Sequence, residues 1–154
     1  MRKSIVFFIA LAVLAAGGAA WGDTNTLTVT AHVKGTCKFS SSTSTLDFGV
    51  LDPANPVLIT GSGTTTFWCT KGITTSMTLA ADYGVNSAGT TRRMKDNSSL
   101  DLIPYSLTLT PDGGTNQGPA FPRTLTISGT VLAVDYSGKT EGDYSDTVVI
   151  SFTP

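Results

Sequence analysis

The side chains best suited to catalysis are few, and the sequence gives them poor partners. His32 is the single histidine, and a general base needs a partner held within hydrogen-bond reach. Its place in an alternating segment puts His32 on the polar face of a strand, so we interpret it as an exposed strand residue. Asp143 and Asp146 could form a carboxylate pair for acid–base chemistry or for calcium. Their spacing and surroundings do not match a calcium loop, and turn and strand-start roles fit them better.

The segment Ser137-Gly138-Lys139-Thr140 is similar to the end of a phosphate-binding loop. The first glycine of that motif would fall at position 133, where the chain has Ala133. A strand rather than a helix is expected to follow, so the segment does not match a phosphate-binding loop. We therefore expect no catalytic residue, no cofactor, no metal site and no small-molecule substrate.

The N-terminal region has the three-part pattern of a secretory signal peptide. The parts are a short basic head, an apolar run and a set of small residues, at residues 1–3, 5–16 and 17–20. The apolar run is shorter than the roughly 20 residues that span a bilayer. We predict that residues 1–22 are a signal peptide cleaved after Gly22, with cleavage after Ala20 as the alternative, and that the mature protein is exported and soluble.

Cys37 and Cys69 are the two cysteines, and both lie in the part that we expect to be exported. In an oxidising compartment two cysteines pair by default. The alternatives are a reactive thiol or a metal site, and two thiols with one histidine make a poor zinc ligand set. We predict a structural disulfide, which would stabilise the fold by roughly 3–4 kcal/mol on the chain-entropy model.

The composition of the mature chain fits an exported β protein. Of ten Lys and Arg, Arg2 and Lys3 lie in the predicted signal, so eight remain against eleven Asp and Glu. The only positive cluster is Arg92-Arg93-Met94-Lys95. A nucleic-acid partner would favour a basic stripe, so none is expected. Threonine occupies 26 positions, and it favours strands while keeping their exposed faces polar without charge.

Most of the mature chain is patterned as short strands separated by turns. The expected strands are Leu46–Leu51, Val57–Thr60, Thr64–Thr70, Thr74–Ala81, Pro104–Thr110, Arg123–Val134 and Tyr144–Thr153. We interpret Gly61-Ser62-Gly63 as a turn and expect a short ribbon around Arg92–Lys95. No stretch shows a helical apolar period of useful length. About seven short strands at this spacing predict an all-β sandwich.

The segment Leu27–Val33 alternates strictly, with apolar residues at odd positions and polar residues at even positions. This period of two predicts a strand with one apolar face, and the segment contains neither glycine nor proline. Periodicity alone favours the first strand of a complete, self-sufficient sandwich. The other interpretation is that the segment fills a gap in a neighbouring molecule.

The last expected strand raises the question of what covers its edge. It carries Val148, Ile150 and Phe152 on one face, and only Thr153 and Pro154 follow in the sequence. A sandwich of this size usually has a closing strand at this place, and an unpaired apolar edge promotes aggregation. We therefore expect another segment to cover it.

Three motifs recur in one known family. Gly142–Phe152 contains G-x-Y-x-D followed by alternating apolar residues, Leu46–Gly49 matches L-x-F-G, and Cys69–Gly72 matches C-x-x-G. About fifteen residues separate the expected mature start from Cys37. Over Asp23–Phe152 the chain thus resembles the spore coat protein U domain family, which includes subunits of archaic (Csu-type) chaperone–usher pili.

The resemblance implies an incomplete immunoglobulin-like β-sandwich, whose missing last strand is completed in trans by a donor strand. A periplasmic chaperone would supply that strand first, and the next like subunit would supply it in the fibre, with an outer-membrane usher assembling the homopolymer. Residues 23–34 would be the donor segment and residues 35–154 the sandwich domain. The implied residues are Leu27, Val29, Ala31 and Val33 for the donor strand, and Val148, Ile150 and Phe152, with the strand around Cys37, for the acceptor groove.

Two functions of different kinds follow, and neither is enzymatic. The first is a structural subunit of a secreted surface fibre, a pilus or fimbria, polymerised by donor-strand exchange and acting in adhesion or biofilm formation. The second is a self-contained secreted spore-coat, matrix or carbohydrate-binding module, in which Leu27–Val33 completes its own sheet. A sugar-binding module should cluster aromatic residues on exposed loops, and here the loops offer only Tyr83, Phe121 and Tyr136.

Overall fold

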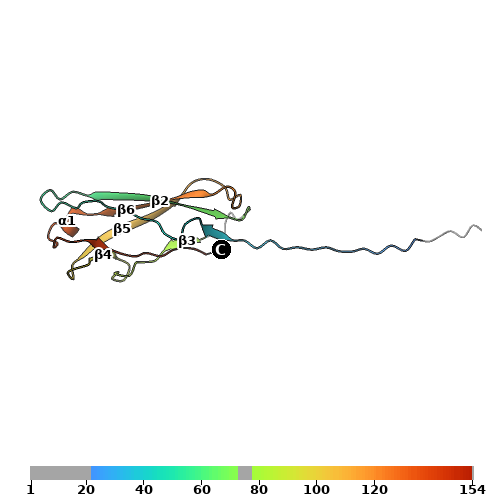
Figure 1. The fold of residues 1–154 in the computed structure, drawn as a ribbon, viewed down its shortest axis with the longest axis horizontal. Coiled ribbons are helices and arrows are strands. Elements are labelled where there is room, and N and C mark those ends of the chain that lie inside the picture. Colours follow the sequence, from blue (N-terminus) through green and yellow to red (C-terminus); the bar gives the residue numbers. More distant parts are fainter. Residues whose placement is uncertain (1–21, 73–77, 154) are drawn as a thin grey trace, which may run out of the picture. The chain divides into compact units, whose positions relative to one another are not determined.

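The computed structural model describes residues 22–72 and 78–153, and these residues form an all-β fold (Figure 1). The chain divides into two units, residues 1–32 and residues 33–154. The described part of the first unit is a segment without helix or strand. We call residues 33–153 the body. Its elements are β1 (Cys37–Phe39), β2 (Ile59–Cys69), β3 (Thr78–Ala81), β4 (Arg92–Asp96), β5 (Leu102–Pro111), β6 (Arg123–Val131), α1 (Ala133–Tyr136), β7 (Tyr144–Ser145) and β8 (Ile150–Thr153).

The strands form two antiparallel sheets. The larger sheet has the order β1-β2-β6-β5-β4-β7, and the smaller one pairs β3 with β8. The longest pairing joins β2 to β6, from Ile59 opposite Val131 to Phe67 opposite Arg123. A curled large sheet with a second, small sheet confirms the predicted fold class, an incomplete immunoglobulin-like β-sandwich.

The disulfide between Cys37 and Cys69 is present and confirms that prediction. The two cysteines are also cross-strand partners in the pairing of β1 with β2. Hydrogen bonds from Ser40 N to Thr66 O and from Thr70 N to Thr36 O, both 2.8 Å long, extend this pairing at its two ends. The start of the body is therefore fixed to the end of its longest strand.

The predicted turn at Gly61-Ser62-Gly63 is wrong, because β2 runs straight through these residues. Each of them pairs with β6, including Gly61 opposite Gly129. The glycines are needed for another reason. A Cβ at Gly63 would collide with the carbonyl oxygen of Thr45, and one at Gly61 would lie 2.5 Å from the carbonyl oxygen of Asp47. The missing side chains let residues 45–48 lie directly against the sheet.

Three other predicted strands change their extent. The expected strand Leu46–Leu51 has no strand pairing, although it lies across the glycines of β2. The expected strand Arg123–Val134 ends at Val131, because α1 follows and turns Tyr136 inward, where it is 2 % exposed. The last expected strand is divided into β7 and β8. The part of Thr74–Ala81 before Thr78 lies outside the described residues.

Two apolar clusters make up the core. Phe67, Cys69, Leu125 and Ile127 form the first, and Ile103, Val131 and Tyr136 form the second. Around these seven buried side chains lie twice as many half-buried apolar ones, among them Leu46, Phe48 and Ile150. The described core is therefore only partly covered. In the same residues, no helix is long and apolar enough to cross a membrane.

The close contact at Gly63 gives a first prediction. Gly63→Ala should destabilise the protein by about 1–3 kcal/mol, because its Cβ meets backbone atoms of Thr45 that cannot rotate away. Thermal unfolding should show a melting temperature several degrees below that of the wild type. Gly113→Ala is the matched control, since nothing lies within 4 Å of a Cβ at that position. Equal melting temperatures for the two variants would contradict the proposed packing of residues 45–48.

Candidate functional site

An open groove runs along the body between residues 44–53 and residues 139–150. Two adjoining cavities form it, of about 610 Å³ towards α1 and about 240 Å³ towards β8. Both cavities are lined by Leu46, Phe48, Met94 and Tyr144, so they are parts of one groove. Its remaining apolar lining comes from Val50, Leu51, Pro53, Ile103, Tyr105, Leu107, Ile127, Tyr136, Val148 and Ile150.

The first edge of the groove is the extended segment 44–51. Leu46 and Phe48 point inward and are half-buried, while their neighbours Thr45 and Asp47 are exposed. Within the described chain, no backbone hydrogen bond joins this segment to a strand; the Gly49 N–H donates to its own turn, at Asp47 Oδ1 (2.8 Å). The segment therefore has a strand-like alternation and a backbone without a partner strand.

The second edge is the chain from β7 to β8, which is hydrogen-bonded on one side. The N–H groups of Asp82 and Val85 donate to the carbonyl oxygens of Val149 (3.0 Å) and Thr147 (3.2 Å). Neither the N–H nor the C=O of Val148 bonds to another described residue. Thr147 and Val149 thus bond to residues 82–85, and the backbone of Val148 between them has no partner among the described residues.

Side chains along this second edge alternate in burial. Residues 144, 146, 148, 150 and 152 are half-buried, whereas residues 145, 147, 149, 151 and 153 are exposed. Val148 and Ile150 line the smaller cavity. Phe152 lies beyond it and packs on Phe39 and Phe67, with ring centroids 4.5 and 4.9 Å apart. Val148, Ile150 and Phe152, which the sequence proposed for the groove, therefore share one face of the strand. The first two line the groove, and Phe152 packs on Phe39 and Phe67 beyond it.

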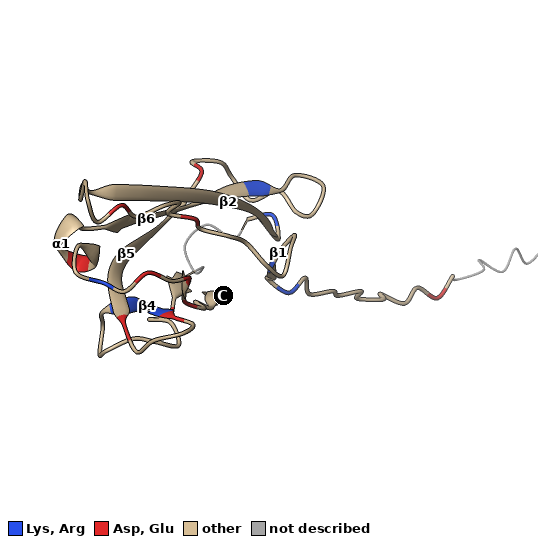
Figure 2. Ribbon diagram, turned by 60° about the vertical axis from the view of Figure 1, so that its left-hand side comes forward, with Lys and Arg blue, Asp and Glu red and all other residues tan. Residues whose placement is uncertain are grey.

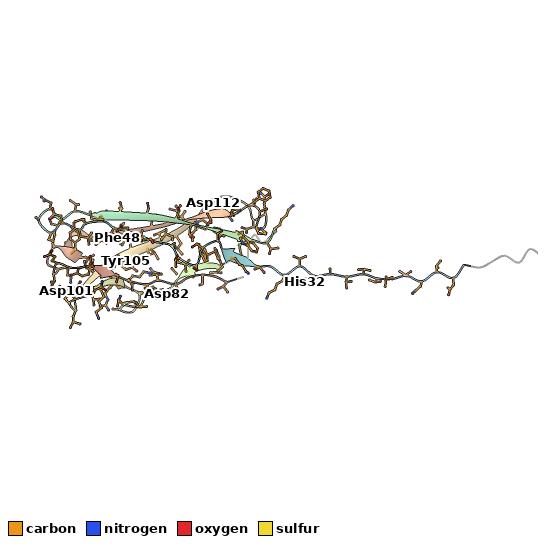
Figure 3. All side chains as sticks on the ribbon, viewed as in Figure 1. His32, Phe48, Asp82, Asp101, Tyr105 and Asp112 are labelled. Carbon is orange, nitrogen blue, oxygen red and sulfur yellow. A yellow bond between two sulfur atoms is a disulfide. The ribbon has the colours of Figure 1, made fainter. Side chains whose placement is uncertain are left out.

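A polar contact fixes this edge at the floor of the groove. The hydroxyl of Tyr105 donates to Asp146 Oδ2 (2.7 Å), and both the backbone and side-chain N–H groups of Asn86 donate to Asp146 Oδ1 (3.2 Å each). Burial, followed by the hydrogen bond to Asp146, raises the pKa of Tyr105 well above its usual range. Figure 3 shows Tyr105 beside Phe48, whose ring lies edge-on at 5.9 Å. Asp146 thus acts as an anchor for the last strand.

A second buried contact holds the beginning of this edge, and no pattern in the sequence indicates it. Asp96 is 2 % exposed, and its Oδ2 accepts the N–H groups of Ser98 (3.2 Å) and Ser99 (2.5 Å). These hydrogen bonds hold the pKa of Asp96 below its usual range, against the effect of burial. Its Oδ1 lies against Gly142, where a Cβ would collide with it. Packing therefore requires a glycine at position 142, two residues before Tyr144.

The other residues that the sequence offered for catalysis or for phosphate or metal binding lie in contacts that stabilise the fold or at the surface. Asp143 accepts the N–H of Asn97 on its carbonyl oxygen (3.2 Å), and the Thr140 N–H donates to Asp101 Oδ2 (2.9 Å). His32 is exposed. Among the described residues, no group of three or more His, Cys, Asp or Glu side chains could hold a metal ion.

The four proposed donor residues are all exposed. Leu27 and Val29 are each 82 % exposed, Val33 is 78 % exposed, and Ala31 is exposed as well.

A family model of the spore coat protein U domain matches residues 23–151. The chain belongs to this family. The spore coat protein U domain is a structural, fimbrial-type domain of exported surface fibres, not an enzyme family. A comparison with curated proteins finds no match. Within the family motif G-x-Y-x-D, the structure shows the contacts of Gly142 with Asp96, of Tyr144 with the Thr140 carbonyl oxygen (2.8 Å), and of Asp146 with Tyr105.

The alternation along the last strand gives a second prediction. Ile150→Asp should place a charge on the half-buried apolar face and cost several kcal/mol, because a carboxylate there has no partner. Val149→Asp is the matched control, since Val149 is 60 % exposed on the opposite face. Yield from the periplasm and thermal unfolding should show a loss for Ile150→Asp alone. Equal behaviour of the two variants would mean that the groove face has been assigned incorrectly.

Proposed function

We propose that this protein is a structural subunit of a secreted surface fibre, a pilus or fimbria, that polymerises by donor-strand exchange. In this proposal residues 1–22 are removed on export, residues 23–34 form the donor segment and residues 35–154 form the acceptor domain. A periplasmic chaperone holds the groove first, and an outer-membrane usher then guides the exchange for the next like subunit. The fibre serves adhesion or biofilm formation.

The observation that carries the proposal is the groove, each of whose two edges has backbone groups without a partner among the described residues. A strand added there can bond to residues 44–51 on one side and to the backbone around Val148 on the other, while its side chains cover the half-buried core. Strand addition of this kind gives affinity through the main chain and specificity through alternate side chains.

The N-terminal segment has the properties that such a strand requires. Leu27–Val33 has seven residues, as many as the groove edge Tyr144–Ile150. Burying its three large aliphatic side chains and one methyl group contributes roughly 5–9 kcal/mol before the cost of ordering. Each additional main-chain hydrogen bond contributes about 1 kcal/mol.

The alternative is a self-contained spore-coat, matrix or carbohydrate-binding module. In such a module the apolar face of Leu27–Val33 would be buried against its own sheet.

Deleting Asp23–Val33 tests the two functions directly. The shortened protein should keep its groove but be unable to complete another subunit, so it should never form chains. It should fold only with a chaperone or with a peptide of sequence Leu27–Val33. The matched control peptide carries Val29→Asp, which puts a charge on the apolar face, and it should not rescue folding. Size-exclusion chromatography and thermal unfolding are the measurements.

The self-contained module predicts the opposite behaviour. The full-length protein would be a heat-stable monomer that is indifferent to the added peptide, and the shortened protein would unfold without rescue. That result would contradict donor-strand exchange.

A further inference from the structure

We propose that neighbouring subunits also meet through a second contact, between an apolar patch at the α1 end of the accepting body and the loop Gly118–Pro122 of the donating body. This inference rests on the proposed donor-strand exchange and adds to it a second surface for the same partner, a like subunit. We call the first surface the end patch, and it consists of Val57, Leu58, Leu132 and Val134.

The end patch gathers where β2 begins and β6 ends. Leu58 and Leu132 directly flank the cross-strand pair Ile59 and Val131, and α1 carries Val134. The Tyr136 hydroxyl bonds to both the N–H (2.8 Å) and the C=O (2.9 Å) of Val57, which ties the chain before β2 to α1. The four side chains are between 49 % and 80 % exposed. Clustered exposed aliphatic side chains of this kind indicate an interaction surface.

The donor segment places the donating body close to the groove of its neighbour. Val33 is four positions before Cys37, which the disulfide fixes to the end of β2. Four residue steps span at most about 14 Å. The disulfide end of the donating body must therefore lie within that distance of the point where Val33 leaves the accepting groove.

Only one end of the groove allows a fibre to continue. At the β8 end, Phe152 packs on Phe39 of β1, so that end adjoins the place where the accepting subunit sends out its own donor segment. If Val33 left the groove there, both neighbours of a subunit would crowd onto the same end. If Val33 leaves at the α1 end, each subunit has one neighbour at each end. The donor strand then runs antiparallel to residues 144–150, and the next body lies beside the end patch.

The disulfide end of the donating body offers a matching surface. The loop Gly118–Pro122 is bound there by the hydrogen bond from Gly118 N to the carbonyl oxygen of Cys69 (3.0 Å), and its Phe121 is 61 % exposed. Among the described aromatic side chains at this end, Phe121 is the exposed one, which suits it to the aliphatic end patch.

Charges at the two ends are also complementary. Lys34 and Lys71 lie at the disulfide end, whereas Asp52 and Asp135 lie in the segments that carry the end patch. In Figure 2 the ribbon is blue, for Lys or Arg, near β1 and red, for Asp or Glu, at α1. Opposite charges around an apolar contact favour this pairing over a patch-to-patch arrangement.

Cross-linking of fibres tests the contact. In the double variant Phe121→Cys/Val134→Cys, a short bismaleimide should join neighbouring subunits into a ladder of covalent oligomers, because the two thiols face each other at every junction. The matched control Phe121→Cys/Val85→Cys places the second thiol at a side chain of similar exposure, 73 %, in the loop beside the last strand. The control should give no ladder. Leu58→Cys replaces Val134→Cys if that variant does not fold.

A charge variant separates this contact from donor-strand exchange. Val134→Asp should bind the free peptide Leu27–Val33 with unchanged affinity, because the peptide carries no body, but it should form at least tenfold fewer fibres. Normal fibre formation by Val134→Asp would overturn the second contact. The same holds if Phe121→Cys/Val134→Cys gives no ladder, or gives a ladder as strong as that of its control. Either result would leave donor-strand exchange standing. If the wild type forms no fibres, and its deletion variant does not bind the peptide, both proposals fail.

Discussion

Among the described residues, the extended segment 44–51 and the groove side of the last strand lack a strand partner across a half-buried apolar core, and the rest of the structure depends on this gap. Unpaired backbone groups and exposed apolar surface are both unfavourable, and edges of this kind otherwise promote aggregation. A single added strand would satisfy both. The gap thus explains why a chain of this size buries only seven apolar side chains among its described residues.

Contacts within the body define both edges of the gap. Glycines of β2 let residues 45–48 lie directly on the sheet, which fixes the first edge. Asp146 connects the second edge to Tyr105 and Asn86, and Asp96 packs against Gly142 where that edge begins. The disulfide at Cys37 fixes the point from which the donor segment leaves. Together these contacts set the two edges between which a strand can enter.

The sequence was sufficient for features that depend on local pattern. Alternation predicted β5 and β6, and the two cysteines in an exported chain predicted their bond. It failed at Gly61-Ser62-Gly63, because glycines that usually mark a turn are here required by a segment that lies 14 (Asp47 to Gly61) to 18 (Thr45 to Gly63) residues earlier. The Asp96–Gly142 and Tyr105–Asp146 contacts join positions about forty residues apart, so no local pattern could reveal them. The functional roles of the donor and groove residues stay predictions.

Amide hydrogen exchange in the complex of the protein lacking residues 23–33 with a Leu27–Val33 peptide tests the central claim most directly. Alternate amides in both edges, residues 44–51 and residues 146–152, should exchange slowly, as do those of the β2–β6 ladder, because the peptide pairs with both edges at once. Slow exchange in the β2–β6 ladder together with fast exchange in either edge would show that the peptide does not complete the sheet there, and it would contradict the account.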